Sequence, residues 1–217
     1  MKRFVLTALA TASLLGALSA CVPLVIGGAM VGGGLVATDR RTSGAQLEDQ
    51  GIELRAANRV RENLGDRAHI NTNSYNRQVL LTGEVPNAQD KALAEQLVAK
   101  VENVRSIVNE LAVSGNTSLT QRSSDSLITG QVKASLVDAK DLYANAFRVV
   151  TERGTTYLMG RVTQREATRA TEIARGVNGV QKVVRIFEII SEEELINTLP
   201  QAPKPDAAPK QPMSPGG

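Results

Sequence analysis

Residues 79–85 read VLLTGEV, and residues 156–162 read TYLMGRV. Each run is mostly apolar, carries a glycine at its fifth position and ends in valine, and the two lie 77 positions apart. Further along, residues 101–108 (VENVRSIV) match residues 177–184 (VNGVQKVV) at an offset of 76. Self-similarity at a nearly constant offset indicates that one structural unit is repeated. The sequence therefore predicts two copies of the same small domain.

The segment before each run predicts an amphipathic helix. Apolar residues recur there at intervals of four, the spacing that places them on one helical face. They are Ala56, Val60 and Leu64 in the first copy and Ile128, Val132 and Leu136 in the second. We align Val60 with Val132, an offset of 72, which assigns about five additional residues to the second copy near positions 138–145.

A β-hairpin is expected after each of these helices, because short β-rich runs flank residues that favour a turn. The strands are predicted at 68–73 and 78–84 in the first copy and at 145–151 and 155–161 in the second. The turns are predicted at Asn76-Arg77 and Arg153-Gly154.

A second helix and a closing strand complete each copy. The helices are predicted to begin at Asn87 and Thr163, and Glu166 follows Thr163 at the spacing of a capping box. The closing strands are predicted at 106–113 and 182–190. The predicted fold class is α+β, with two tandem α-β-β-α-β sandwiches in which two helices cover one face of a three-stranded sheet.

The N-terminus has the features of a targeting signal. Lys2 and Arg3 precede an uncharged apolar stretch, residues 4–18, and small residues follow. This arrangement is typical of a secretory signal peptide. Residues 18–21 (LSAC) also resemble a bacterial lipobox, in which cleavage precedes the cysteine and the cysteine is acylated. Because Cys21 is the only cysteine of the chain, we predict that it is the lipidation site; the alternative is an ordinary signal peptide with an incidental cysteine.

The two ends of the mature chain differ in composition from the repeats. Five glycines lie within residues 22–37, and six of the eight prolines lie within residues 200–217. We therefore predict a tether before the repeats and a disordered tail after them. The expected organisation is a signal peptide at 1–20, a lipidated glycine-rich tether at 21–47, domains at 48–115 and 122–191, and a disordered proline-rich tail at 192–217.

The repeat signatures resemble those of a known family. The Leu-x-Gly-x-Val motif at 81–85 and 158–162 and the Val-x-Gly-Val motif at 177–180 are similar to those of BON domains, named for bacterial OsmY and nodulation proteins. Together with the lipobox and the ATDRR sequence at 37–41, they resemble the dual-BON-domain outer-membrane lipoproteins of Gram-negative bacteria. The resemblance spans residues 20–190 and implies a lipid-anchored, periplasm-facing protein that supports envelope integrity and accumulates at division sites. The residue after the cysteine, Val22, is consistent with the outer membrane, because an aspartate at this position marks lipoproteins that enteric bacteria retain at the inner membrane.

The composition excludes most catalytic and metal-binding classes. The chain has one histidine, His69, and one cysteine, and it lacks the common motifs for nucleophilic, zinc-dependent or phosphate-binding sites. We interpret His69 as structural and expect no catalytic residue, no metal site and no cofactor. Aromatic residues make up only 3% of the chain, which argues against binding of single-stranded nucleic acid.

Charge distinguishes the two copies. Residues 48–113 carry 8 basic and 10 acidic side chains, whereas residues 120–190 carry 11 basic and 7 acidic ones. In the first helix of the second copy, Leu127 lies about 100° around from the apolar stripe and is predicted to project outward. An exposed apolar side chain near basic residues is typical of a membrane-surface contact. The predicted phospholipid-binding residues are Leu127, Gly130, Gln131, Lys133, Ala134 and Arg122.

The family resemblance supports the same helix and leaves alternatives open. It implies that this helix binds anionic phospholipid of the inner leaflet through an aromatic residue, where this chain has Leu127. A second implied partner is the outer-membrane β-barrel assembly machinery. The alternative functions are therefore a protein adaptor that docks through this helix and a peptidoglycan-associated module. Leu127 could also cover a gap to the first domain.

Overall fold

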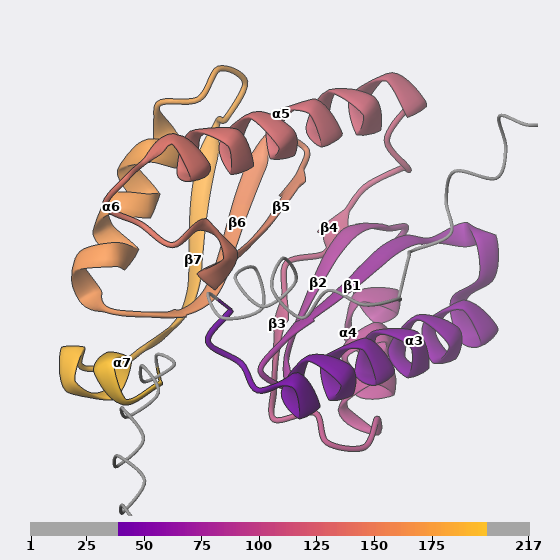
Figure 1. Cartoon of the computed structure of the whole chain (residues 1–217). Helices are drawn as coiled ribbons and strands as arrows, with labels where there is room; N and C mark the ends of the chain where they lie inside the picture. The colour runs from indigo at the N-terminus through magenta and orange to yellow at the C-terminus, as the bar shows by residue number, and fades with distance from the viewer. Residues whose placement is uncertain (1–38, 199–217) are drawn as a thin grey trace, which may run out of the picture. The chain divides into compact units, whose positions relative to one another are not determined.

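The computed structural model describes residues 39–198, which all belong to one compact unit of the chain (Figure 1). This part contains two α-β-β-α-β domains in sequence, followed by a short helix. The predicted α+β fold class is confirmed. Within the described range no helix combines the length and hydropathy that crossing a bilayer requires. The predicted signal peptide, Cys21, the glycine-rich stretch and the proline-rich end lie outside the described residues.

The first domain packs two helices on one face of its sheet. Its elements are α3 (Ser43–Leu64), a 3-10 turn (Gly65–Arg67), β1 (His69–Tyr75), β2 (Gln78–Val85), α4 (Ala88–Ala99), β3 (Ser106–Asn109) and β4 (Ala112–Val113). β2 is central, antiparallel to β1 and parallel to both β3 and β4. The helices bury their apolar sides against alternate residues of β2, among them Val79, Leu81 and Val85.

The second domain repeats this arrangement. Its elements are α5 (Leu119–Asp138), a 3-10 turn (Ala144–Ala146), β5 (Phe147–Glu152), β6 (Thr155–Val162), α6 (Gln164–Arg175) and β7 (Lys182–Ile189). β6 is central, antiparallel to β5 and parallel to β7. The predicted capping box at Thr163 and Glu166 is present and begins α6.

The first helices of the two domains, α3 and α5, correspond at an offset of 76 residues. The predicted alignment of these helices at an offset of 72 was therefore wrong by about one helical turn. Asp49 accepts hydrogen bonds from the backbone N–H groups of Asn76 and Arg77 in the β1–β2 turn. Asp125 does the same for Arg153 and Gly154 in the β5–β6 turn. These aspartates are therefore equivalent, and Ile52 rather than Ala56 corresponds to Ile128.

Both predicted turns are confirmed and explain why each hairpin is tight. Asn76 and Arg77 have φ values of 48° and 67°, and Arg153 and Gly154 have φ values of 52° and 71°. Positive φ at both central residues defines the type I′ turn, whose twist suits a two-residue hairpin. The carboxylates of Asp49 and Asp125 satisfy the N–H groups that such a turn exposes.

Several boundaries differ from those predicted. The helix α3 begins at Ser43, after its N-cap Thr42, and so includes the last residues of the segment predicted as a tether, 21–47. The strand predicted at 106–113 is interrupted after Asn109, where the Asn109 side chain accepts a hydrogen bond from the Leu111 N–H. A seven-residue helix, α7 (Glu192–Thr198), occupies the start of the segment that was expected to be disordered.

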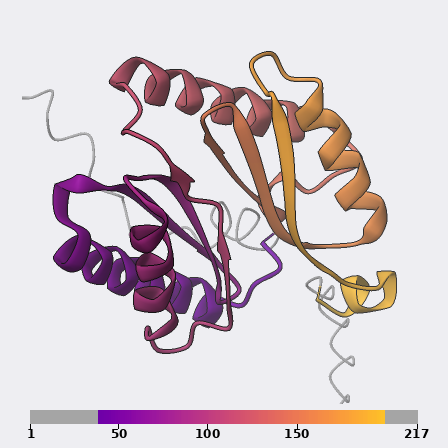
Figure 2. The same cartoon turned by 180° about the vertical axis from the view of Figure 1, so that it is seen from behind.

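The two sheets contact each other through the faces that their own helices leave uncovered. Leu80 of β2 alternates with the core residues Val79 and Leu81, and it packs against the second domain. The shared apolar cluster comprises Tyr75, Leu80, Tyr157, Met159 and Ile186, with Val108, Val150 and Val184 at its edge. Consequently α3 and α4 lie on the outer side of one sheet, and α5 and α6 lie on the outer side of the other (Figures 1 and 2).

Candidate functional site

The outer face of α5 carries the predicted phospholipid-binding residues. Leu127 is 70% exposed, while Ile128, Val132 and Leu136 are buried in the core. The outward orientation of Leu127 is therefore confirmed, and Leu127 does not cover a gap to the first domain. The exposed apolar residues of this helix are Leu119, Leu127 and Val137, and the small residues Gly130 and Ala134 are exposed as well.

Local hydrogen bonds fix this helix on its domain. The Ser118 hydroxyl caps α5 by accepting from the Gln121 N–H. Asp125, which is 3% exposed, ties the middle of the helix to the β5–β6 turn. The outer face is thus presented by a rigid element rather than by a loop.

Between Leu119 and Val137 the charges of α5 that are not buried are positive, and Asp138, the last residue of the helix, is an exposed acidic side chain. Asp125 is the only acidic residue between Leu119 and Val137, and it is buried. Arg122 and Lys133 form no ion pair with any described residue, and the buried Nε of Arg122 has no hydrogen-bond partner there. The corresponding helix α3 differs, because it carries Glu48, Glu53 and Glu62 besides Asp49.

The structure separates the predicted site residues into two groups. At about 100° per residue, Leu127, Gly130, Gln131 and Ala134 lie on one side of the outer face. Arg122 and Lys133 lie roughly 120–140° around the helix from Leu127. The basic side chains therefore flank the outer face on one side instead of surrounding Leu127.

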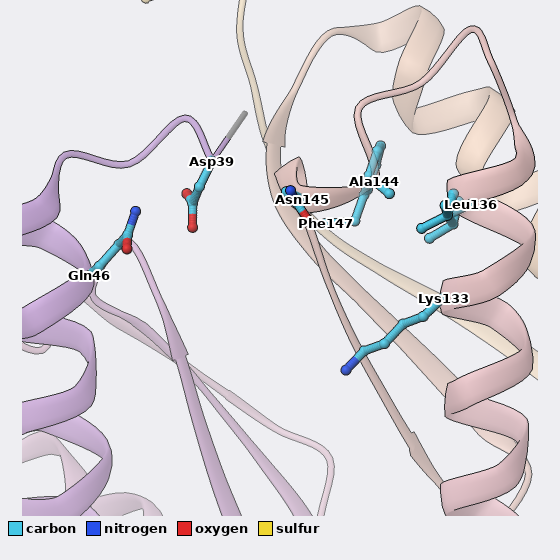
Figure 3. A pocket seen from close by; sticks show the side chains of 8 residues that line it. Asp39, Gln46, Lys133, Leu136, Ala144, Asn145 and Phe147 are labelled. Carbon is cyan, nitrogen blue, oxygen red and sulfur yellow. The ribbon is translucent and has the colours of Figure 1, made fainter. Parts of the chain in front are cut away.

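Lys133 also lines a cavity of about 480 Å³ (Figure 3). Leu136, Val137 and Phe147 form its apolar wall, whereas Asp39 and Gln46 line it from the N-terminal side of the described chain. Lys133 extends from α5 toward this cavity in Figure 3. Its ammonium group is thus placed at the border between the outer face of α5 and the first domain.

Two consecutive arginines before α3 contact different domains. Arg40 donates to both carboxylate oxygens of Glu166 on α6, at 2.7 and 2.6 Å. Burial raises the pKa of Glu166, but the hydrogen bonds from Arg40 and from the Thr163 backbone outweigh it, so the net pKa is lowered. Sequence reasoning missed this pair, and the only signal was the ATDRR motif, which has no local periodicity.

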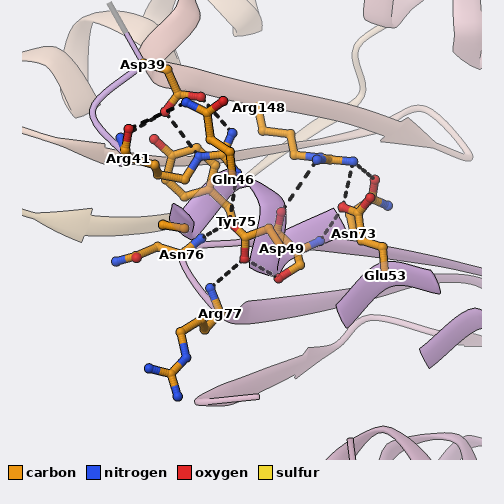
Figure 4. Close-up of polar contacts among 12 residues, drawn as sticks. Asp39, Arg41, Gln46, Asp49, Glu53, Asn73, Tyr75, Asn76, Arg77 and Arg148 are labelled. Atoms are coloured by element: carbon orange, nitrogen blue, oxygen red, sulfur yellow. Dashed lines mark hydrogen bonds and ion pairs between the residues drawn. The ribbon is translucent and has the colours of Figure 1, made fainter. Parts of the chain in front are cut away.

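Arg41 belongs to a polar network of the first domain that reaches the second (Figure 4). It donates to Asp49 at 2.8 Å, and its guanidinium lies 4.2 Å from the centre of the Tyr75 ring. Arg148 of β5 forms an ion pair with Glu53 of α3 at 2.9 Å. The segment before α3 is thereby integrated into the folded structure.

Comparison with known proteins agrees with this architecture. Residues 49–115 and 124–190 each match the BON domain family. The chain is 41% identical over 184 residues to "Outer membrane lipoprotein DolP" of Haemophilus influenzae, covering 82% of this chain and 95% of that protein. It is 34% identical over 154 residues to "21 kDa hemolysin" of Actinobacillus pleuropneumoniae, covering 70% and 79%.

Among solved structures, CdsD, a structural protein of the type III secretion system of Chlamydia trachomatis, is similar at 14% identity. That similarity covers 68% of this chain and 99% of CdsD, with a TM-score of 0.29.

Proposed function

Because the chain belongs to the BON domain family and is an outer-membrane lipoprotein, we propose that it binds anionic phospholipid through the outer face of α5. In this proposal the protein is non-enzymatic and supports outer-membrane integrity at division sites. The supporting observation is that α5 exposes Leu119, Leu127 and Val137, and that its one exposed acidic side chain is Asp138 at its C-terminal end.

The expected binding is weak and is helped by the anchor. Complete burial of a leucine side chain contributes about 1.5–3 kcal/mol, and a Lys or Arg near anionic lipid contributes about 1 kcal/mol. Acylation of Cys21 would keep the domain close to the bilayer and raise its effective concentration there. Seventeen residues lie between Cys21 and Asp39, and a chain of that length spans at most about 60 Å.

We expect Leu127→Glu to reduce binding to phosphatidylglycerol vesicles by at least about tenfold. The substitution removes an apolar group and places a negative charge against anionic headgroups. The measurement is flotation of the unlipidated chain, residues 22–217, which retains Arg40 and Arg41. Leu127→Trp should bind more strongly, because indole favours the membrane interface, and high salt should weaken binding by the wild type.

The matched control is Leu54→Glu. Leu54 is 64% exposed on α3, close to the 70% of Leu127, but its helix carries the acidic residues of the first domain. Vesicle binding should be unchanged in this variant. If Leu127→Glu floats as well as the wild type, α5 is not the lipid site and docking of an outer-membrane assembly protein on this face becomes the better hypothesis.

Cys21→Ser is expected to abolish acylation, because neither the thioether bond nor the cleavage before the cysteine can occur. Labelled palmitate should be incorporated into the wild type alone, and the variant should keep its signal peptide and migrate as a larger protein on a denaturing gel. Equal labelling of both proteins would contradict the assignment of Cys21.

A further inference from the structure

Three potential metal ligands meet where the two domains join. His69 begins β1, Glu84 lies opposite it on β2, and Glu152 ends β5 of the second domain. His69 Nδ1 lies 3.2 Å from Glu84 Oε2. One ligand atom from each residue lies within 4.8 Å of the others. Two elements of one domain and one of the other thus converge on a single point.

The two carboxylates are buried without a matching positive charge. Glu84 is 0% exposed and Glu152 is 7% exposed. Within the described chain neither pairs with a lysine or arginine: Thr117 donates to Glu84, and Asn71 donates to Glu152. By contrast, the buried carboxylates Asp49 and Glu166 each have an arginine partner.

The electrostatics at Glu152 reflect this surplus of negative charge. Burial raises its pKa, the hydrogen bond from Asn71 opposes the rise, and the nearby charge of Glu84 adds to it, so the net pKa is above the usual value. A buried pair of carboxylates is stabilised by a proton or by a cation placed between them.

An unpartnered hydroxyl lies beside the cluster. Thr82 is two residues before Glu84, so both side chains lie on the same face of β2. Thr82 also pairs across the sheet with Asn71, the residue that holds Glu152. The Oγ1 of Thr82 is buried and has no hydrogen-bond partner among the described residues. A metal-bound water would provide a partner for such a hydroxyl.

We propose that His69, Glu84 and Glu152 form a binding site for Zn²⁺ that links the two domains. An imidazole nitrogen with carboxylate oxygens is a ligand set that zinc accepts, and three protein ligands leave the fourth tetrahedral position for water. Zinc ligands lie about 3.4 Å apart in such a site, given bond lengths of about 2.0–2.2 Å. The three ligand atoms now lie within 4.8 Å of one another, so binding of the ion would draw them closer together.

The proposed ion has a structural consequence. Because the first domain supplies two ligands and the second supplies one, the metal would add a bond across the domain contact. Asn71 acts in the second coordination shell, since its donation to Glu152 orients that carboxylate. This differs from the expectation of no metal site, which rested on the scarcity of histidine and cysteine.

The test uses the unlipidated chain, residues 22–217, without a histidine tag and after treatment with EDTA. Titration with ZnCl₂ in a calorimeter should give one ion per chain, and the melting temperature should rise. His69 is the only histidine of the chain, so its imidazole NMR signals report directly on the site. They should shift on addition of zinc but not on addition of MgCl₂.

Two variants separate the site from nonspecific binding. His69→Asn and Glu152→Gln should each lower zinc affinity at least tenfold, whereas Glu102→Gln, at an exposed carboxylate of the first domain, should not. Glu152→Gln removes one of two buried negative charges, so this variant should have a higher melting temperature than the metal-free wild type. That result would show that the variant folds. Absence of zinc binding, binding that survives both substitutions, or the same response to Mg²⁺ would overturn the proposal.

Discussion

Replacement of Gly83 by valine is expected to lower the free energy of unfolding by roughly 3 kcal/mol or more. Gly83 has a φ of 113°, which L-residues with a side chain rarely adopt. A Cβ at this position would lie 2.0 Å from the carbonyl oxygen of His69, which is backbone and cannot rotate away. Both effects act on β2, the central strand of the first sheet. The measurement is urea unfolding of the unlipidated chain, followed by circular dichroism.

Gly130→Ala is the control for this prediction. A Cβ at Gly130 meets nothing within 4 Å, and the residue lies inside helix α5. Alanine should therefore stabilise the protein slightly, by about 0.5–1 kcal/mol. An unchanged urea midpoint in Gly83→Val would show that β1 and β2 separate here more easily than the structure indicates.

Glu166→Ala is expected to cost about 3–5 kcal/mol, because it leaves the buried charge of Arg40 without its carboxylate. The side chains of Arg40 and Glu166 are only 2% and 1% exposed. The substitution also removes the reciprocal bond of the capping box at Thr163. Asp141→Ala provides the matched control: its partner Arg169 lies on the same helix α6, but that pair is about half exposed and should contribute less than about 1 kcal/mol.

The pH dependence of this effect has a defined sign. The pKa of Glu166 is lower in the folded state than its ordinary value of about 4.3. Its stabilising contribution is therefore present above that pH and is lost as the pH falls through the folded-state pKa. Urea unfolding at neutral pH and near pH 3 should show the difference between wild type and Glu166→Ala shrinking in acid. A difference that stays constant would contradict the role of the charged pair.

Most of each domain was predictable because its signals are local. The type I′ turns, the capping box and the glycine at the end of β2 are each determined by residues close in sequence. The helix alignment failed for a related reason. A stripe with four-residue spacing looks the same after a shift of one turn, so Val60 could be matched to Val132 as easily as to Leu136. The aspartates at 49 and 125, which contact the turns, remove this ambiguity.

The contact between the domains was not predicted, although the sequence contains a sign of it. Leu80, Tyr157 and Met159 make the β2 and β6 segments apolar on both faces, as expected for strands that are covered on two sides. The Arg40–Glu166 pair joins residues 126 positions apart, and no pattern in one sequence reveals such a partner. In the candidate lipid site, the outward direction of Leu127 was predictable from helical periodicity. The positions of Arg122 and Lys133 were misjudged because closeness in sequence was taken for closeness on the helix.

The pair of arginines before α3 also has a mechanical meaning. Arg40 binds α6 of the second domain and Arg41 binds α3 of the first, although the two residues are neighbours in the chain. Tension applied from the N-terminal side would therefore be shared between both domains before it could peel the first helix from its sheet. The force would act on the Arg40–Glu166 and Arg41–Asp49 ion pairs together, so each pair would carry only part of it. A lipid-anchored protein built in this way would follow the movements of its membrane as a single body.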